Sequence, residues 1–530
     1  METPQRSQPN AHSAIGDLML EEWTTDLLAH GEENYRYPPN YFASDPSSLI
    51  TSSLVHSFTL GTGSHIFTSI IPIIEAAESE VIIVTCFWTR SSSLDQLCTA
   101  LRRLSDKALV RGGSRIRVSI CFSSRSVWQK LFQTSSLGGH VYTAKSWAKT
   151  LGLPSSEELR GLDMTIKSVF VRPFSVMHPK FVVVDRRKAF LPSCNVSWED
   201  WFEGCIELSG PVIDQFVRFW EEFWDRGSNR SPATNAHSSG GAHNALPFRG
   251  GGTSGHNATV NGHVDIPTDF IGSGTAHDQL PRRMPPFTTI CLDPKISLPA
   301  VFLPSPHHLN PRFRPFPWQT AAPAPPTPLN TFILHLLSHA RTSIYIQTPN
   351  LTSPPILSAL LAALHRGVNV HIVTNARLML LEQLGTAGTT TARCVRKLVK
   401  RYRALLTVSA TRTTAPSISD AGPSLERALP PPGRLRIEYF QPLSNSTSPM
   451  NGTGTENAQE PVQSHLKLTI VDQEVTVLGS GNMDRASWYT SQELGVAFFS
   501  AELAGRVRGA VERTLVGRKR GVFGVGGGEG

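Results

Sequence analysis

The strongest constraint on the fold is an internal repeat of secondary-structure signals in the two halves of the chain. Residues 64–124 read as a helix, a short apolar strand, an amphipathic helix and a second strand, and residues 331–377 repeat that order. Alternating strands and helices predict an α/β fold, with helices packed on mixed, largely parallel sheets. Two copies predict two similar α/β domains that arose by internal duplication.

The segments around the repeat differ from it in composition, and they set the predicted domain boundaries. The linker between the copies is rich in Gly, Ser and Asn and then in Pro, which is typical of disordered and extended chain. We predict a polar tail at 1–45 with a short helix around 18–28, a first domain at 46–226 and a linker at 227–328. A second domain follows at 329–512, with loose inserts at 407–433 and 444–461, and then a basic, Gly-rich tail at 513–530.

Each half ends in the same short motif. It reads His-x-Lys, four apolar residues, Asp, six further residues and a turn of small residues that ends in Asn. Two matches at equivalent places in a repeat are a much more specific signal than one. The first copy supplies His178, Lys180, Asp185, Ser193 and Asn195, and the second supplies His465, Lys467, Asp472, Ser480 and Asn482.

The four apolar residues of each motif are largely β-branched and predict a strand. Because side chains alternate along a strand, the His and Lys of each motif share one face, and the Asp points to the other. We therefore expect Asp185 and Asp472 to be structural. They are predicted to anchor the turn after the strand through hydrogen bonds to backbone amides. Ser193 is assigned to the same structural group.

The paired motifs suit the cleavage of a phosphodiester. Lys180, Lys467, Asn195 and Asn482 can hold the non-bridging oxygens and the charge that builds on them. One imidazole can attack phosphorus, and the other can protonate the leaving alkoxide and then activate water or an alcohol. Ser480 is predicted to join the catalytic group. This scheme needs no cofactor and no metal, and we find no metal-ligand cluster in the sequence.

A reacting imidazole needs a partner that orients it through its other nitrogen. Glu493 begins the apolar stretch after the second motif and can accept that proton. Glu207 is the predicted counterpart in the first half. It lies 12 residues after Asn195, whereas Glu493 lies 11 residues after Asn482.

These two motifs resemble those of the phospholipase D superfamily, and the resemblance covers about 46–226 and 329–512. Segments 345–350 and 366–371 look most like the branch of cardiolipin synthases and bacterial phospholipases D. The resemblance implies two α/β domains with the active site at their interface, and a phosphohistidine intermediate. It also implies that His178 is the nucleophile and His465 the acid. The first motif departs from the family at Pro192, where the family has Gly.

Charge and composition narrow the partners further. The net charge of +8 favours an anionic partner such as phosphate, nucleic acid or an acidic membrane surface. No apolar run is long enough to span a membrane, and no secretory signal is visible. The seven cysteines show no CxxC spacing, which favours a reducing compartment. We therefore expect an intracellular protein that is soluble or peripheral to a membrane.

Three hypotheses about function stay open at this stage. The first is an enzyme that hydrolyses or exchanges phospholipid headgroups at a membrane surface, with water or an alcohol as acceptor. The second is a nuclease or other phosphodiesterase; the basic helix predicted at 395–406 supports it, although its apolar face suits a domain core. The third is an inactive phosphate-binding scaffold. Nucleic acid is the less expected partner, and the oligomeric state is not predicted.

Overall fold

The computed structural model describes residues 14–125, 138–171, 175–225, 287–306, 323–414, 430–443 and 460–524. Most of the predicted linker and of the insert at 444–461 lies outside the described residues. So do the middle of the insert at 407–433 and both ends of the chain.

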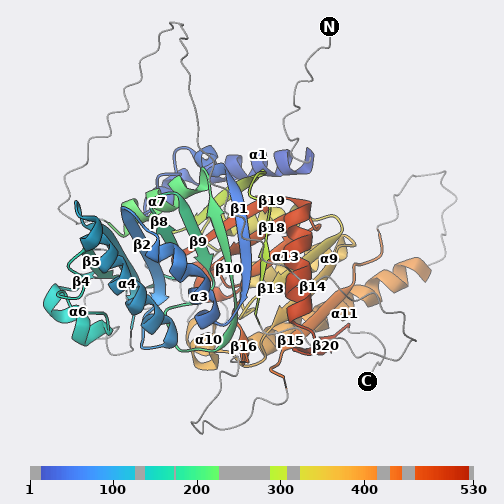
Figure 1. Ribbon diagram of the computed structural model, residues 1–530. Helices are drawn as coiled ribbons and strands as arrows, with labels where there is room; N and C mark the ends of the chain where they lie inside the picture. The colour runs from blue at the N-terminus through green and yellow to red at the C-terminus, as the bar shows by residue number, and fades with distance from the viewer. Residues whose placement is uncertain are drawn as a thin grey trace, which may run out of the picture. The chain divides into compact units, whose positions relative to one another are not determined.

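The first half of the structure follows the order expected from the repeat (Figure 1). Helices α1 (Ala14–Ala29) and α2 (Gly31–Tyr35) and the 3₁₀ turn η1 (Pro46–Leu49) precede it. Its elements are β1 (Ile50–Gly61), α3 (Gly63–Glu75), β2 (Glu80–Phe87), α4 (Ser92–Arg111), β3 (Ile116–Ser124), β4 (His140–Val141), α6 (Ala144–Leu151), β5 (Leu162–Ser168), β6 (Phe170–Val171), β7 (Ser175–Val176), β8 (Phe181–Val184), β9 (Lys188–Pro192), β10 (Trp201–Ser209) and α7 (Val212–Phe223).

Two strands, β11 (Thr288–Cys291) and β12 (Ser297–Ser305), precede the second half. That half contains α8 (Pro328–His339), β13 (Ser343–Gln347), α9 (Pro354–His365), β14 (Asn369–Thr374), α10 (Leu380–Ala387), α11 (Thr391–Thr414), β15 (Leu435–Phe440), β16 (Gln463–Ser464), β17 (Leu468–Val471), β18 (Val475–Gly479), α12 (Arg485–Tyr489), β19 (Glu493–Phe499), α13 (Ala501–Thr514) and β20 (Lys519–Phe523).

Both halves pair their strands in the same way, which confirms the α/β prediction. In the first half β2, β3 and β5 are parallel, and β8 pairs antiparallel with β2 and begins a hairpin with β9. In the second half β13, β14 and β15 are parallel, and β17 takes the place of β8. The sheet is mixed, but it is less parallel than predicted because each motif folds back as an antiparallel hairpin.

A single sheet joins the two halves. Strand β1 lies beside β10 and also pairs with β12, and β12 pairs in turn with β19. Eighteen strands of the described residues belong to this sheet. Because β11 and β12 are ordered strands, the linker prediction is wrong for residues 288–305. The prolines at 299 and 304 hid the buried apolar run of residues 300–303.

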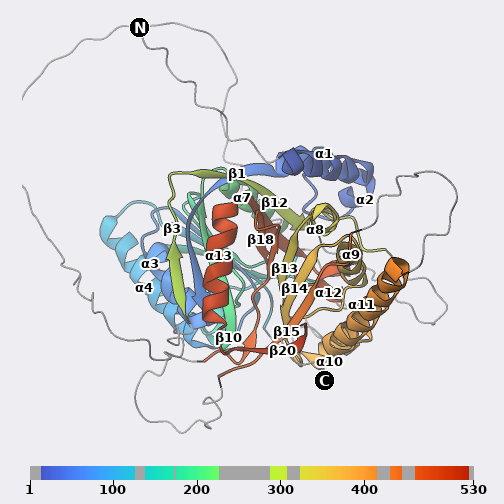
Figure 2. The ribbon, with the colours of Figure 1, turned by 90° about the vertical axis from the view of Figure 1, so that its right-hand side faces the viewer.

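The predicted tails also contain structure. Helix α1 confirms the short N-terminal helix and lies against α8 (Figure 2). Strand β20 pairs with β15, so the prediction of a tail from 513 onwards is wrong for residues 519–523. Its mixture of basic and Gly residues concealed a strand that lies at the edge of the sheet.

Helix α4 shows how the local sequence sets the layers that cover the sheet. The Ser91 hydroxyl caps the helix by accepting the Leu94 amide at 3.2 Å, and Gly112 ends it at a φ of 69°. Leucines at 94, 97, 101 and 104 face the core. Burial of each leucine side chain stabilises the fold by roughly 1.5–3 kcal/mol.

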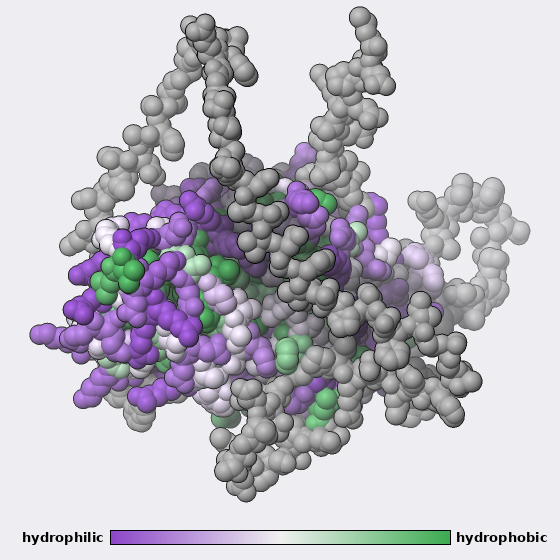
Figure 3. All heavy atoms as spheres, viewed as in Figure 1, coloured by the Kyte–Doolittle hydropathy of each residue, from purple (hydrophilic) through white to green (hydrophobic). Residues whose placement is uncertain are grey.

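The basic helix predicted at 395–406 lies within α11. Val395, Leu398 and Tyr402 are buried, while the basic side chains between them are exposed. The apolar face is therefore part of the core, as its width predicted. Among the helices of the described residues, none is both long and apolar enough to cross a membrane. Hydrophilic side chains predominate on the face seen in Figure 3, and hydrophobic ones form small separate groups.

Candidate active site

The aspartate of each motif follows a strand, β8 or β17, and the histidine lies three residues before that strand begins. The Asp185 carboxylate accepts hydrogen bonds from the three amides of residues 78–80 at 2.7–2.9 Å. The Asp472 carboxylate accepts from the amides of residues 341–343 at 2.8–2.9 Å. The predicted bonds to backbone amides are confirmed. The amides belong to the loop before the neighbouring strand, however, and not to the turn after the motif strand.

The two motif histidines are held by glutamates from opposite halves. His178 Nδ1 lies 2.8 Å from the Glu493 carboxylate, which belongs to β19 in the second half. His465 Nδ1 lies 2.7 Å from the Glu203 carboxylate, which belongs to β10 in the first half. Both pairs are buried almost completely. The site therefore lies at the junction of the two halves, where it was expected.

The motif serines hold these glutamates. Ser480 Oγ donates to the Glu493 carboxylate and accepts from the Leu494 amide at 3.0 Å. Ser193 Oγ donates to the Glu203 carboxylate and accepts from the Gly204 amide at 2.9 Å. The structure therefore gives the two serines the same place, although Ser480 was assigned to the catalytic group and Ser193 to the structural one. Pro192 in the first turn has not displaced Ser193.

The prediction that Glu207 is the counterpart of Glu493 is wrong. The Glu207 carboxylate lies 2.7 Å from Lys188 Nζ and accepts from Ser57 at 3.0 Å. Glu203 takes the predicted position, four residues and roughly 13 Å earlier on the same strand. Counting forward from the motif Asn failed because the segment from the Asn to the Glu contains helix α12 in the second half and is therefore longer there. Counting back from the next helix would have found it, since Glu203 precedes α7 by nine residues and Glu493 precedes α13 by eight.

The two motif lysines are buried, and they differ in what they contact. Lys180 Nζ donates to the backbone oxygen of His178 at 2.9 Å. Lys467 Nζ lies 2.8 Å from each ring nitrogen of His465 and 3.5 Å from the Ser193 backbone oxygen. The Nε2 atom of His465 therefore faces an ammonium group, whereas the lysine of the first motif is directed to the backbone.

The motif asparagines are engaged with other groups. Asn195 Oδ1 accepts from the Phe87 amide at 3.2 Å. Asn482 Nδ2 donates to the Asp484 carboxylate at 3.0 Å. Within the described residues, neither side chain is hydrogen-bonded to a motif histidine. Their predicted contact with a phosphate therefore needs a rotation of each side chain or a shift of the turn.

Burial and neighbouring charge shift the pKa values of all these groups. Burial lowers the pKa of His465 to about 3 against the effect of Glu203, and it lowers the pKa of His178 in the same direction. Burial also lowers the pKa of Lys467 to about 7. Burial alone would raise the pKa of Glu493 and of Glu203, but the paired histidines and the lysines bring both below the usual value.

These directions define the protonation pattern of the resting site. At neutral pH both imidazoles are neutral and both carboxylates are charged. Each Nδ1–H then donates to its glutamate, and each Nε2 keeps a lone pair. This is the state that a nucleophile or a general base requires.

A small cavity adjoins the second motif. Lys467 and Asn482 are among its polar lining residues, and most of its wall is apolar, with Leu329, Ile333 and Trp488 contributing. The centroid of the Trp201 ring lies 4.7 Å from that of the His465 ring. The polar groups of the second motif therefore border apolar side chains.

Comparison with known proteins places the second half in a family. Residues 333–515 match the family model described as cardiolipin synthase, PLD-like domain. This range contains the second motif and Glu493, and it excludes the whole first half. No curated protein sequence gives a significant match to the chain.

Several solved structures are similar to the chain at low sequence identity. Phosphatidylserine synthase from Haemophilus influenzae Rd KW20 is 12% identical with a TM-score of 0.49, and the match covers 90% of this chain and 91% of that one. Polyphosphate kinase from Porphyromonas gingivalis is 9% identical with a TM-score of 0.41, covering 88% of this chain and 48% of that one. Nuc from Salmonella typhimurium is 20% identical with a TM-score of 0.22, covering 37% of this chain and 91% of that one.

Proposed function

We propose that the whole chain is a phosphodiester-cleaving or transferring enzyme that acts on phospholipid headgroups, as the match of residues 333–515 to a phospholipase D-like family model suggests. The observation that carries the proposal is the reciprocal pairing of His178 with Glu493 and of His465 with Glu203. Two imidazoles that are both oriented by buried carboxylates are the groups that a two-step transfer through a phosphohistidine requires.

We assign the nucleophile to His178. Its side chain is 13% exposed, against 5% for His465, and its lysine is directed to the backbone. Attack by Nε2 forms the nitrogen–phosphorus bond and breaks the bond from phosphorus to the headgroup oxygen. His465 is the weaker nucleophile because the Lys467 ammonium faces its Nε2.

His465 supplies the proton to the leaving oxygen in this scheme. A bound phosphodiester brings a negative charge to the site, which raises the pKa of His465 and favours its protonated form. In the second step His465 takes a proton from water or an alcohol, which attacks phosphorus and releases His178. General acid–base catalysis of this kind contributes roughly 10²–10⁴-fold to the rate.

The remaining groups bind and position the substrate. Lys180 and Lys467 neutralise the non-bridging oxygens, and Glu493 and Glu203 keep the two imidazoles in the reactive tautomer. The Trp201 ring beside His465 and the apolar residues around Lys467 and Asn482 favour a substrate with an apolar part, as a phospholipid has. We therefore propose that the enzyme works at a membrane surface.

A nuclease or other phosphodiesterase is the second candidate. The observation in its favour is the exposed basic face of α11, formed by Arg396, Lys397, Lys400, Arg401 and Arg403. Binding to nucleic acid through such a face would weaken steeply with salt, because phosphate contacts release counterions.

Lipid mass spectrometry on phosphatidylcholine/phosphatidylglycerol vesicles, incubated with the full chain and a primary alcohol, tests the proposal. We expect phosphatidic acid or phosphatidyl-alcohol from the wild type, and neither from His178→Ala or His465→Ala. His365→Ala is the matched control, since His365 is an exposed residue at the end of α9. Cleavage of single-stranded DNA without any lipid product would favour the nuclease. Turnover of neither substrate would favour the inactive scaffold.

A further inference from the structure

The contact between α1 and α8 has an apolar centre and a polar edge. Trp23 of α1 is fully buried, packs edge-on against Phe332 and donates to Thr331 Oγ1 at 3.0 Å. This packing fixes one helix on the other. It also fixes how the side chains at the edge of the contact meet.

That edge carries two acidic and two imidazole side chains at helical spacing. Glu22 and Asp26 are four residues apart on α1, and His335 and His339 are four residues apart on α8. Residues at this spacing lie on one face of a helix. The two pairs therefore face each other across the contact.

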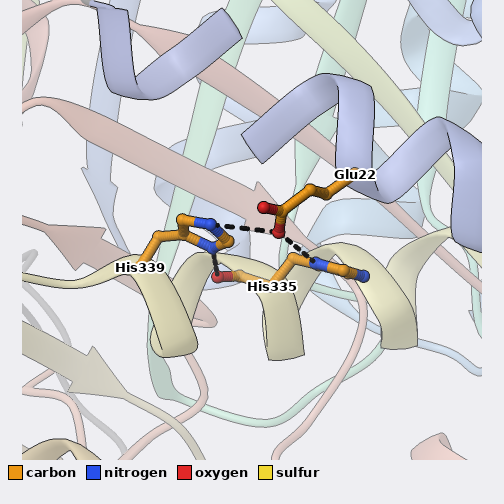
Figure 4. Close-up of side chains that lie close together, drawn as sticks. All are labelled: Glu22, His335 and His339. Carbon is orange, nitrogen blue, oxygen red and sulfur yellow. Dashed lines mark hydrogen bonds and ion pairs between the residues drawn. The ribbon is translucent and has the colours of Figure 1, made fainter. Parts of the chain in front are cut away.

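Three of these side chains converge on one point (Figure 4). Glu22 Oε2 lies 3.2 Å from His339 Nε2 and 4.0 Å from His335 Nδ1. All three ligand atoms lie within 4.8 Å of one another. A tetrahedral metal with bonds of about 2.0–2.2 Å needs ligand atoms somewhat over 3 Å apart, so a small side-chain rotation closes the wider gap.

The other ring nitrogen of each histidine is already held. His339 Nδ1 donates to the His335 backbone oxygen at 2.9 Å, and His335 Nε2 lies 3.2 Å from the Asp26 carboxylate. With those nitrogens protonated, His339 Nε2 and His335 Nδ1 each keep a lone pair directed to Glu22. Second partners of this kind, a backbone carbonyl or a carboxylate, are typical of histidines that bind a metal.

We propose that Glu22, His335 and His339 bind Zn²⁺, with Asp26 as the positioning partner of His335. Two imidazoles and one carboxylate are a ligand set that zinc prefers, and a water molecule completes the tetrahedron. The site is open enough for that water, since Glu22 is 48% exposed and the histidines 21–22%. The metal cross-links α1 to α8 and is separate from the paired histidines of the active site.

Isothermal titration of the full chain with ZnCl₂, after removal of metal by a chelator, tests the site. We expect the wild type to bind zinc in this titration. Thermal unfolding with and without zinc should show a higher melting temperature for the zinc-bound wild type. Asp26→Asn should weaken the affinity roughly 10–100-fold, as loss of such a partner does. Glu22→Gln and His339→Ala should each weaken it more. The control variants His365→Ala and His178→Ala should bind zinc as the wild type does.

Wild-type affinity in both Glu22→Gln and His339→Ala would overturn the proposal, as would a wild type that binds no zinc. X-ray absorption on the zinc-loaded wild type tests the same ligands without any variant. It should show imidazole nitrogen and oxygen ligands at about 2.0–2.2 Å. Sulfur at about 2.3 Å would instead place the metal on cysteine thiolates and contradict the assignment.

Discussion

The two halves share their strand order, but different helices cover the equivalent face of the sheet in each. In the first half α7 packs large rings there: Phe216 and Phe219 lie against Phe181, and Trp220 is buried as well. In the second half α13 buries Leu503, Val507 and Val511 but no aromatic ring, and a hollow lined by Tyr345, His371 and Arg508 opens beside it. The two halves therefore share their backbone pairing but differ in the side chains that pack on the sheet.

Charged groups occupy part of the space that rings fill in the first half. The Arg508 guanidinium stacks on the Tyr345 ring at 3.3 Å and donates to His371 Nδ1 at 2.9 Å. His371 in turn lies 2.6 Å from Glu438. The two motif copies differ in a comparable way, since Lys467 faces an imidazole and Lys180 faces the backbone.

The largest expected effect separates the roles of the two histidines. His178→Ala should lower kcat at least about 10³-fold on every phosphodiester, because it removes the nucleophile. His465→Ala should recover most of its rate on a nitrophenyl phosphodiester, whose leaving group needs no proton. Steady-state kinetics on both substrates measures this difference. If the nitrophenyl substrate rescues His178→Ala instead, the assignment is reversed.

Core truncations test the difference between the helices. Phe216→Ala should lower the free energy of unfolding by roughly 3–5 kcal/mol because it leaves a large cavity in a filled face. Val507→Ala in α13 is also fully buried but removes only two methyl groups, so about 1.6 kcal/mol is expected. Urea unfolding of both variants measures the gap. A loss in Val507→Ala as large as that in Phe216→Ala would contradict this expectation.

A third pair of variants tests whether Glu203, and not Glu207, orients a motif histidine. Glu203→Gln should lower kcat by roughly 10–100-fold, as loss of a partner that orients a reactive imidazole does in metal sites. Glu207→Gln, on the same strand, should leave kcat unchanged because that side chain pairs with Lys188. A KM effect without a kcat effect in Glu203→Gln would be evidence against the orienting role.

The smallest effect concerns pH and distinguishes the two lysines. Lys467 has a pKa lowered to about 7 by burial, so it loses its charge as the pH rises through that value. Its hold on phosphate should then weaken, and kcat/KM should fall above about pH 7. Lys467→Arg keeps the charge and should move this alkaline limb upwards, whereas Lys180→Arg should not. A limb that is the same in all three proteins would contradict the assignment.

Sequence spacing predicted most of the site because the two motif copies carry the same residues at the same intervals. The strand period itself does not place His178, Lys180 and Asp185, since the first two lie just before β8 and Asp185 just after it. Glu203 was missed because α12 changes the length of one connection, and β12 was missed because its prolines resemble a linker. The cluster of Glu22 with His335 and His339 depends on tertiary packing, although the His-x-x-x-His spacing on a predicted helix was visible.

The reciprocal histidine–glutamate pairs make each half incomplete alone, since each imidazole takes its carboxylate from the other half. Contacts of this reciprocal kind are what a two-fold symmetric dimer makes with itself. The chain therefore resembles a homodimer whose subunits have been joined covalently. In a true homodimer every substitution appears twice, so the two sites must stay identical. Covalent joining removes that restriction, so Lys180 can contact the backbone while Lys467 contacts an imidazole.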